Sequence, residues 1–240
     1  MRYRRLGRTA LQVSELCLGT MNFGPQTPED ESFAIMDRAV ELGINFFDTA
    51  DMYGPHINEE LVGRAIQGKR DRFVIATKFG ILRPAGQAMV RGISGRPAYV
   101  RESCEGSLRR LGVETIDLYY AHEDDAHVPT ADWVGAFDQM IRSGAIRHYG
   151  LSNFPPARAQ EVIDVATSEG LALPVAIQPW GRGQAFHFGQ GRHLDRVARR
   201  HKFRPARMRG DRQHHVARQN LRIAQHLDHV LHPRGRQAGT

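Results

Sequence analysis

Several features that would assign this chain to a familiar class are scarce or missing in its 240 residues. It has two cysteines, Cys17 in a strand pattern and Cys104 in a helix pattern, which suits reduced, buried thiols and excludes a disulfide-rich scaffold. No run approaches the roughly 20 apolar residues that a membrane helix needs. The basic start, residues 1–7, is not followed by the apolar stretch of a signal peptide. We therefore expect a cytoplasmic protein with no membrane contact.

Two kinds of binding motif are missing as well. No glycine-rich dinucleotide fingerprint follows a strand pattern and no Walker-type phosphate loop occurs, which excludes a Rossmann-type nucleotide site. His122, Asp124, Asp125 and His127 are residue types that bind metals, but no further residues at ligand spacing accompany them. The sequence therefore predicts no metal site.

The positive charge lies at one end of the chain. The formal net charge is +7, and residues 181–240 hold 14 of the 33 Lys and Arg but only three of the 26 Asp and Glu. That segment has a net charge of +11, against −4 for the first 180 residues. Eight of the twelve histidines also lie beyond residue 180, and no glutamate does. The chain thus divides into a mildly acidic body, residues 1–180, and a basic tail, residues 181–240.

In the body, short apolar runs alternate with amphipathic stretches at helical spacing. The runs lie near 15–20, 45–49, 73–77, 116–121, 147–151 and 174–178, and the helix patterns near 29–42, 58–67, 98–111, 130–142 and 155–169. Such an alternation predicts an α/β protein with a parallel sheet and right-handed crossovers. The long glycine-containing segment 80–97 interrupts it, and is either substrate-facing surface or a loop without a role.

Four chemically active side chains follow the ends of these apolar runs: Asp48, Tyr53, Lys78 and His122. Parallel strands bring their C-terminal ends to one face, so we expect these four residues to converge. Together they suit carbonyl reduction. A tyrosine can protonate the substrate oxygen if a lysine brings its pKa toward neutrality, an aspartate can hold the lysine, and a histidine can orient the substrate.

Longer segments around these residues carry a wider pattern, and through them the body resembles the aldo-keto reductases. The segments are GINFFDTA (43–50), YG (53–54), NEELVG (58–63), ATKFG (76–80), SLRRLG (107–112), DLYYAH (117–122), GAIRHYGLSNF (144–154) and AIQP (176–179). The resemblance covers about 180 residues. It implies a (β/α)8 barrel of the TIM type, NADPH as hydride donor, and small aldehydes or ketones as substrates.

The same resemblance implies which residues hold the cofactor. Ser152 and Asn153 would bind the nicotinamide carboxamide, and Gln178 would bind the same amide. The segment from Gly19 through Thr20 to Met21, at the end of the first barrel strand, would lie against the cofactor together with Asp48.

The resemblance stops after Trp180, with about six strand–helix units where a barrel has eight. Three interpretations of the irregular basic tail remain open. It is a nucleic-acid-binding tail, a helical tail over 192–200 and 216–232 that packs on the sheet, or a segment read out of frame in a GC-rich gene, which we favour. The alternative to an NADPH-dependent enzyme is therefore an incomplete barrel without activity, whose tail binds acidic partners or nothing.

Overall fold

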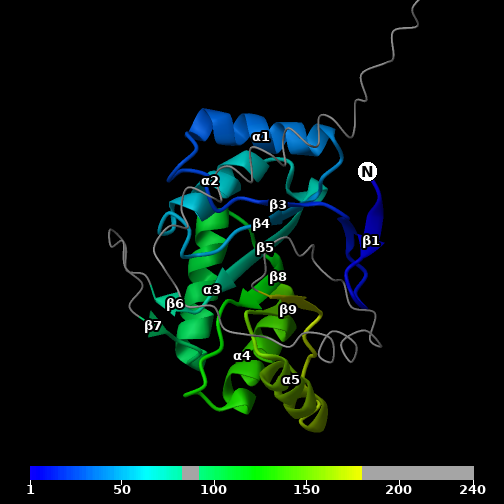
Figure 1. The fold of residues 1–240 in the computed structure, drawn as a ribbon, viewed down its shortest axis with the longest axis vertical. Helices are drawn as coiled ribbons and strands as arrows, with labels where there is room; N and C mark the ends of the chain where they lie inside the picture. The colour runs from blue at the N-terminus through cyan, green and yellow to red at the C-terminus, as the bar shows by residue number, and fades with distance from the viewer. Residues whose placement is uncertain (83–91, 180–240) are drawn as a thin grey trace, which may run out of the picture. The chain divides into compact units, whose positions relative to one another are not determined.

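A computed structural model describes residues 1–82 and 92–179, and a parallel six-stranded sheet is its centre (Figure 1). The strand order is β10-β9-β8-β5-β4-β3. The strands are β3 (Cys17–Gly19), β4 (Phe46–Asp48), β5 (Val74–Phe79), β8 (Ile116–Ala121), β9 (Ile146–Ser152) and β10 (Ala176–Gln178). All six predicted strands are confirmed, several with shorter bounds. The predicted tail, 181–240, lies outside the described residues.

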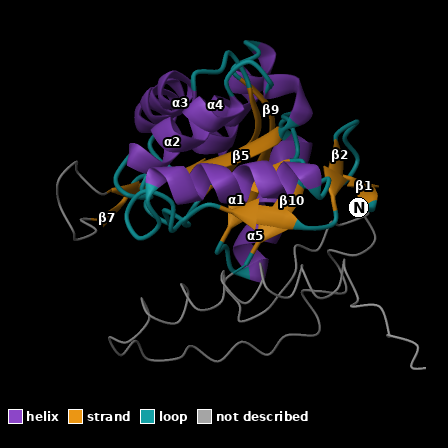
Figure 2. Ribbon diagram, turned by 90° about the horizontal axis from the view of Figure 1, so that it is seen from above, coloured by secondary structure: helices purple, strands orange, loops and turns teal. Residues whose placement is uncertain are grey.

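Five α-helices connect these strands in the described part of the chain. They are α1 (Glu29–Glu41), α2 (Ile57–Ile66), α3 (Pro97–Leu111), α4 (Thr130–Arg142) and α5 (Pro156–Ser168). Successive helices contact each other, and Figure 2 shows them around the outer side of the strands. The sheet curls into part of an α/β barrel, as the sequence predicted. No helix among the described residues has the length and apolar character needed to span a bilayer.

The helices begin and end largely as their sequence signals indicate. Helix α3 starts at Pro97 and stops where Gly112 takes a left-handed conformation with φ +63°. At helix α1, Pro28 is the N-cap residue and no side-chain hydrogen bond caps the helix. The hydroxyl of Ser32, one turn into the helix, instead donates to the Thr27 and Pro28 carbonyls.

The core consists of two layers on opposite faces of the sheet. Strands β5 and β8 are buried at every residue, as expected for parallel strands covered on both faces. The inner layer joins residues of alternate strand positions: Phe46, Val74, Ala76, Leu118 and Tyr120. The outer layer packs stacked aromatic rings under α4, with Phe79 on Tyr119 and Phe137 on Tyr149.

Two short antiparallel hairpins were not predicted. Strands β1 (Tyr3–Arg5) and β2 (Gln12–Ser14) pair at the N-terminus, and Leu6 and Val13 from this hairpin join the inner layer of the core. Strands β6 (Ile81–Leu82) and β7 (Gly92–Ile93) pair within the segment that we expected to be a loop. The first hairpin therefore fills one end of the sheet's inner side.

Candidate active site

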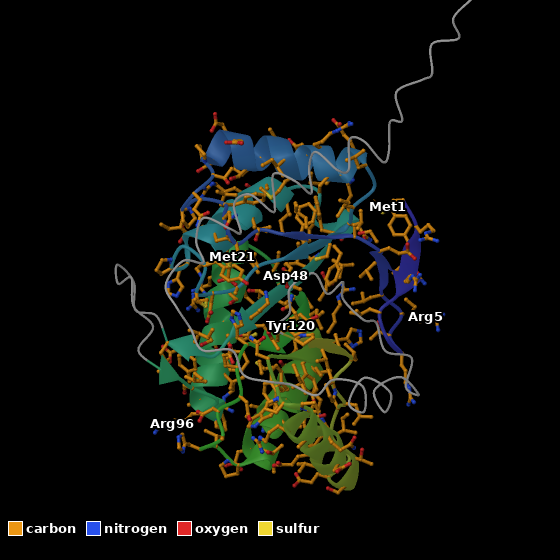
Figure 3. All side chains as sticks on the ribbon, viewed as in Figure 1. Met1, Arg5, Met21, Asp48, Arg96 and Tyr120 are labelled. Atoms are coloured by element: carbon orange, nitrogen blue, oxygen red, sulfur yellow. The ribbon has the colours of Figure 1, made fainter. Side chains whose placement is uncertain are left out.

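The predicted site residues lie where the strands end. Asp48 is the last residue of β4, Lys78 the penultimate residue of β5, and His122 follows β8 directly. Because side chains alternate along a strand, Lys78 shares the inner face with Val74 and Ala76. Figure 3 shows Asp48 and Tyr120 among the side chains in the middle of the sheet. The four predicted catalytic residues are brought together.

Lys78 is the centre of this group. Its Nζ lies 2.6 Å from Asp48 Oδ2, 2.7 Å from the Thr49 carbonyl oxygen and 3.4 Å from the Tyr53 hydroxyl. The residue is 1% exposed, and three oxygens surround its three N–H donors. Burial disfavours the ammonium, but the charge of Asp48 and the contact with Tyr53 outweigh it, so the pKa of Lys78 is raised. Lys78 is therefore a fixed positive charge.

The tyrosine departs from the expectation in one respect. Tyr53 lies in the turn after β4, and the Lys78 ammonium is 5.1 Å from its ring centre. Burial raises the pKa of Tyr53 above its ordinary value, although the Lys78 charge acts in the opposite direction. The expected shift toward neutrality is thus not found in the protein alone. The phenol is protonated at neutral pH, which is the form that a general acid needs.

The histidine is held neutral beside this phenol. The His122 ring meets the Tyr53 ring edge-on, with centroids 6.1 Å apart. Burial, aided by the charge of Lys78, lowers the pKa of His122 to about 3. Its Nδ1 is buried and has no hydrogen-bond partner among residues 1–82 and 92–179. A neutral imidazole offers one donor and one acceptor, so it can bind a carbonyl oxygen without competing as an acid.

The residues predicted to hold a cofactor surround this group in different ways. Among the described residues, none beyond its chain neighbours has an atom within 4 Å of the position that a Cβ at Gly19 would take, and Met21 is exposed. Ser152 ends β9 and is buried. Gln178 ends β10, donates from Nε2 to Asp48 Oδ2 over 3.4 Å, and has a buried Oε1 without a partner in the described part of the chain. These residues leave polar atoms and space beside the predicted tetrad.

Two of the predicted cofactor residues are already engaged. The Thr20 side chain is fully buried and points into the protein, where its hydroxyl contacts the Asp48 carbonyl oxygen at 3.0 Å and Asn58 at 2.9 Å. Asn153 has φ +63°, and its Nδ2 donates to the His122 carbonyl and to Glu123. The Thr20 backbone is engaged as well, because its N–H donates to the Asp48 carbonyl and its carbonyl accepts from Asn58 Nδ2. Of the side-chain atoms of these two residues, the Oδ1 of Asn153 is the one left to meet a ligand among the described residues.

Sequence reasoning assigned no role to a buried polar network behind Lys78. Glu59, fully buried in α2, accepts from Thr77 at 2.5 Å and from Arg110 Nε at 2.7 Å. The close approach of α2 to α3 makes this pair possible, since a Cβ at Gly63 would lie 2.6 Å from the Arg110 carbonyl oxygen. The sequence feature that could have indicated this network is the pair of polar residues 58 and 59 on the apolar side of a predicted helix.

Asp51 is a further buried carboxyl near the site. It is 5% exposed, and its Oδ1 lacks a partner among the described residues. Burial first, and then the charge of Glu59, raise the pKa of Asp51 to about 8, although Arg110 and Lys78 oppose the shift. In the part of the chain that the structure describes, no three His, Cys, Asp or Glu residues form a group that could hold a metal ion.

Comparison with known proteins agrees with this geometry. The family model described as the Aldo/keto reductase family matches residues 15–181. The fold is similar to that of aldo-keto reductase AKR11C1 from Bacillus halodurans in its holo form, with a TM-score of 0.68 and 36% sequence identity. That match covers 75% of this chain but only 58% of the Bacillus protein. The match over most of its length places this chain in the aldo/keto reductase family.

Proposed function

We propose that this protein reduces small aldehydes or ketones to alcohols, with NADPH as the hydride donor and Tyr53 as the general acid. The observation that carries the proposal is Lys78, which is buried between Asp48 and Tyr53 with 2.6 Å and 3.4 Å contacts. Burial of a charged lysine costs desolvation free energy even when the lysine is paired. A buried lysine beside a phenol therefore favours a functional use of its charge. Small carbonyl compounds as partners, no nucleic acid, and a cytoplasmic location belong to the same proposal.

The residues around the tetrad fit a nicotinamide. Its carboxamide needs both donors and acceptors, and Gln178 Oε1 is a buried acceptor without a partner among the described residues. Ser152 and the Oδ1 of Asn153 lie at the neighbouring strand end, since Asn153 N donates to the Gln178 carbonyl at 3.1 Å. At Gly19 no atom of the described residues beyond its chain neighbours lies within 4 Å of the Cβ position, so a group of the cofactor can approach the backbone there. When bound, NADPH supplies the hydride for the substrate carbon.

The protein's own side chains account for the proton. The Tyr53 hydroxyl donates its proton to the substrate oxygen as that oxygen gains negative charge. The Lys78 ammonium stabilises the phenolate left behind, and Asp48 keeps the ammonium in place. His122, neutral at physiological pH, donates a hydrogen bond to the same substrate oxygen and fixes its position. Water then returns a proton to Tyr53.

The full chain tests the proposal directly. We expect loss of NADPH absorbance when the purified protein meets a panel of small aldehydes and ketones, with an equal amount of alcohol formed. NADH in place of NADPH tests the cofactor preference. Binding of NADPH without turnover would contradict the proposed carbonyl reduction but would support the proposed cofactor site. Neither binding nor turnover would favour the alternative, an incomplete barrel without activity.

A further inference from the structure

Asn58 uses its whole side chain inside the protein. It lies in the first turn of α2 and is 0% exposed. Its Oδ1 accepts from the hydroxyls of Thr20 at 2.9 Å and Thr49 at 2.5 Å. Its Nδ2 donates to the carbonyl oxygens of Thr20 at 2.6 Å and Phe23 at 2.8 Å. Both donors and both acceptor positions of the amide are satisfied, which fixes its orientation.

These four contacts join two segments that belong to the proposed site. Thr49 follows Asp48, and its carbonyl oxygen accepts from Lys78 Nζ at 2.7 Å. Thr20 lies in the segment from Gly19 to Met21, and its backbone N–H donates to the Asp48 carbonyl at 2.9 Å. Asn58 therefore holds the loop after β3 and the loop after β4 to the same helix. Thr49 is thus the one residue that links Asn58 to the Lys78 ammonium.

A general stabilising role does not account for the position of these bonds. The four bonds do not cap a helix, since α2 has no side-chain cap hydrogen bond. Instead three of the four bonds go to Thr20 and Thr49, the residues that immediately follow β3 and β4, where the proposed cofactor segment and Asp48 lie. A shift of Thr49 would remove one of the three oxygens around Lys78 Nζ.

We propose that Asn58 is a positioning residue of the active site, which holds the Thr49 carbonyl against the Lys78 ammonium and the Gly19–Met21 segment beside it. The inference rests on the proposed function and adds a residue to it. Asn58 touches none of the reacting groups itself. Asn58 affects the reaction indirectly, because it fixes the position of Lys78.

The test follows the Lys78 ammonium without requiring turnover. The chain has only three lysines, Lys69, Lys78 and Lys202, so ¹⁵N-lysine labelling gives a simple spectrum, and Lys78→Arg assigns the signal. A buried ammonium with three acceptors exchanges its protons slowly with water. We expect Asn58→Ala to speed this exchange about tenfold, because the ammonium is then held by fewer fixed oxygens.

Matched variants separate positioning from general stability. Asp117→Asn removes a buried carboxylate at the other end of the same strands, where Asp117 accepts from Arg70 and from Ile75 N, and should leave the exchange rate of Lys78 unchanged. Thr49→Val removes the hydroxyl that donates to Asn58 Oδ1, and Thr49→Ser keeps that hydroxyl. We expect faster exchange of the Lys78 ammonium in the valine variant only. The two Thr49 variants replace the Asn58→Ala test if that variant does not fold.

Three outcomes would overturn the proposal. They are equal exchange rates in Asn58→Ala and Asp117→Asn at matched stability, equal rates in the two Thr49 variants, and fast exchange of the Lys78 ammonium in the unaltered protein. Absence of NADPH oxidation in the unaltered protein would instead reject the proposed function. In that case the exchange rates still decide whether Asn58 positions Lys78.

Discussion

The side-chain amide of Gln178 lies 3.4 Å from the Asp48 carboxylate, although 130 positions separate the two residues in the chain. Their strands, β10 and β4, are not neighbours in the sheet, since β9, β8 and β5 lie between them. The contact is possible because the sheet curls and both side chains point to its inner side. Residues from the second and the last strand of the sheet therefore share one site.

A first prediction concerns Asp51, whose folded-state pKa of about 8 lies above its ordinary value of 3.8. Between these pH values the folded protein keeps a proton that the unfolded chain has lost, so this group's contribution to stability declines as pH rises from about 4 to about 8. Asp51→Asn removes that decline. We expect its free energy of unfolding to exceed that of the unaltered protein by at least about 1 kcal/mol at pH 8.

Urea unfolding at pH 5 and pH 8 measures the effect, and the advantage of Asp51→Asn should be smaller at pH 5. Asp71→Asn, a change at an exposed position, is the control and should alter neither value. A stability difference for Asp51→Asn that does not grow with pH would contradict the buried, protonated carboxyl.

The second prediction concerns His122 and has the opposite sign. Its pKa falls from 6.5 to about 3 on folding, so below pH 6.5 the unfolded chain binds a proton that the folded protein does not. Stability from this group is complete above pH 6.5 and is lost as pH falls, with a slope of up to about 1.4 kcal/mol per pH unit. His122→Gln should flatten the stability curve between pH 6.5 and pH 4, and exposed His127→Gln should not. An unchanged slope in both variants would show that His122 does not titrate in this way.

The buried ion pair behind Lys78 leads to a third prediction. Arg110→Met leaves the fully buried Glu59 without its charged partner, and we expect a loss of about 3 kcal/mol in the free energy of unfolding. Glu59→Gln keeps hydrogen bonding to Thr77 and removes the charge, so it should cost less and lower the pKa of Asp51. Arg109→Met, at an exposed pair one residue away, should cost under about 0.5 kcal/mol. Equal losses for the two arginines would show that the buried pair is not special.

Much of the site could be predicted because it depends on one rule. Asp48, Lys78 and His122 each end an apolar run, and the C-terminal ends of parallel strands meet. Gln178 was assigned to the cofactor through the family resemblance, and its contact with Asp48 was not foreseen, since it depends on how strongly the sheet curls.

The parts that could not be predicted depend on distant partners. Asn58 and Glu59 appear in the sequence as the polar start of a helix, and their partners Thr20, Thr77 and Arg110 lie 18 to 51 positions away. The β1–β2 hairpin consists of two three-residue strands, too short for a periodic pattern. The pKa of Tyr53 depends on the balance between burial, which raises it, and the Lys78 charge, which lowers it. Residue identity alone does not give the size of either effect.

The fourth prediction concerns the grip on the cofactor. The family match ends at residue 181, and the resemblance places the contacts to the adenosine phosphates beyond that point. We therefore expect this chain to bind NADPH much more weakly than a family member that has these contacts. Fluorescence titration of NADPH measures the dissociation constant. A dissociation constant in the low micromolar range or tighter would show that other residues supply these contacts.

The most direct measurement of the central claim compares Tyr53→Phe with the unaltered protein in NADPH-dependent carbonyl reduction. Loss of a positioned acid lowers a rate by about 10²–10⁴-fold, while NADPH affinity should stay within a few fold. Tyr3→Phe is the matched control and should keep full activity. It removes the hydroxyl of a tyrosine near the N-terminus, which donates to the Gly43 carbonyl. Reduction at an undiminished rate by Tyr53→Phe would contradict the assignment of Tyr53 as the proton donor.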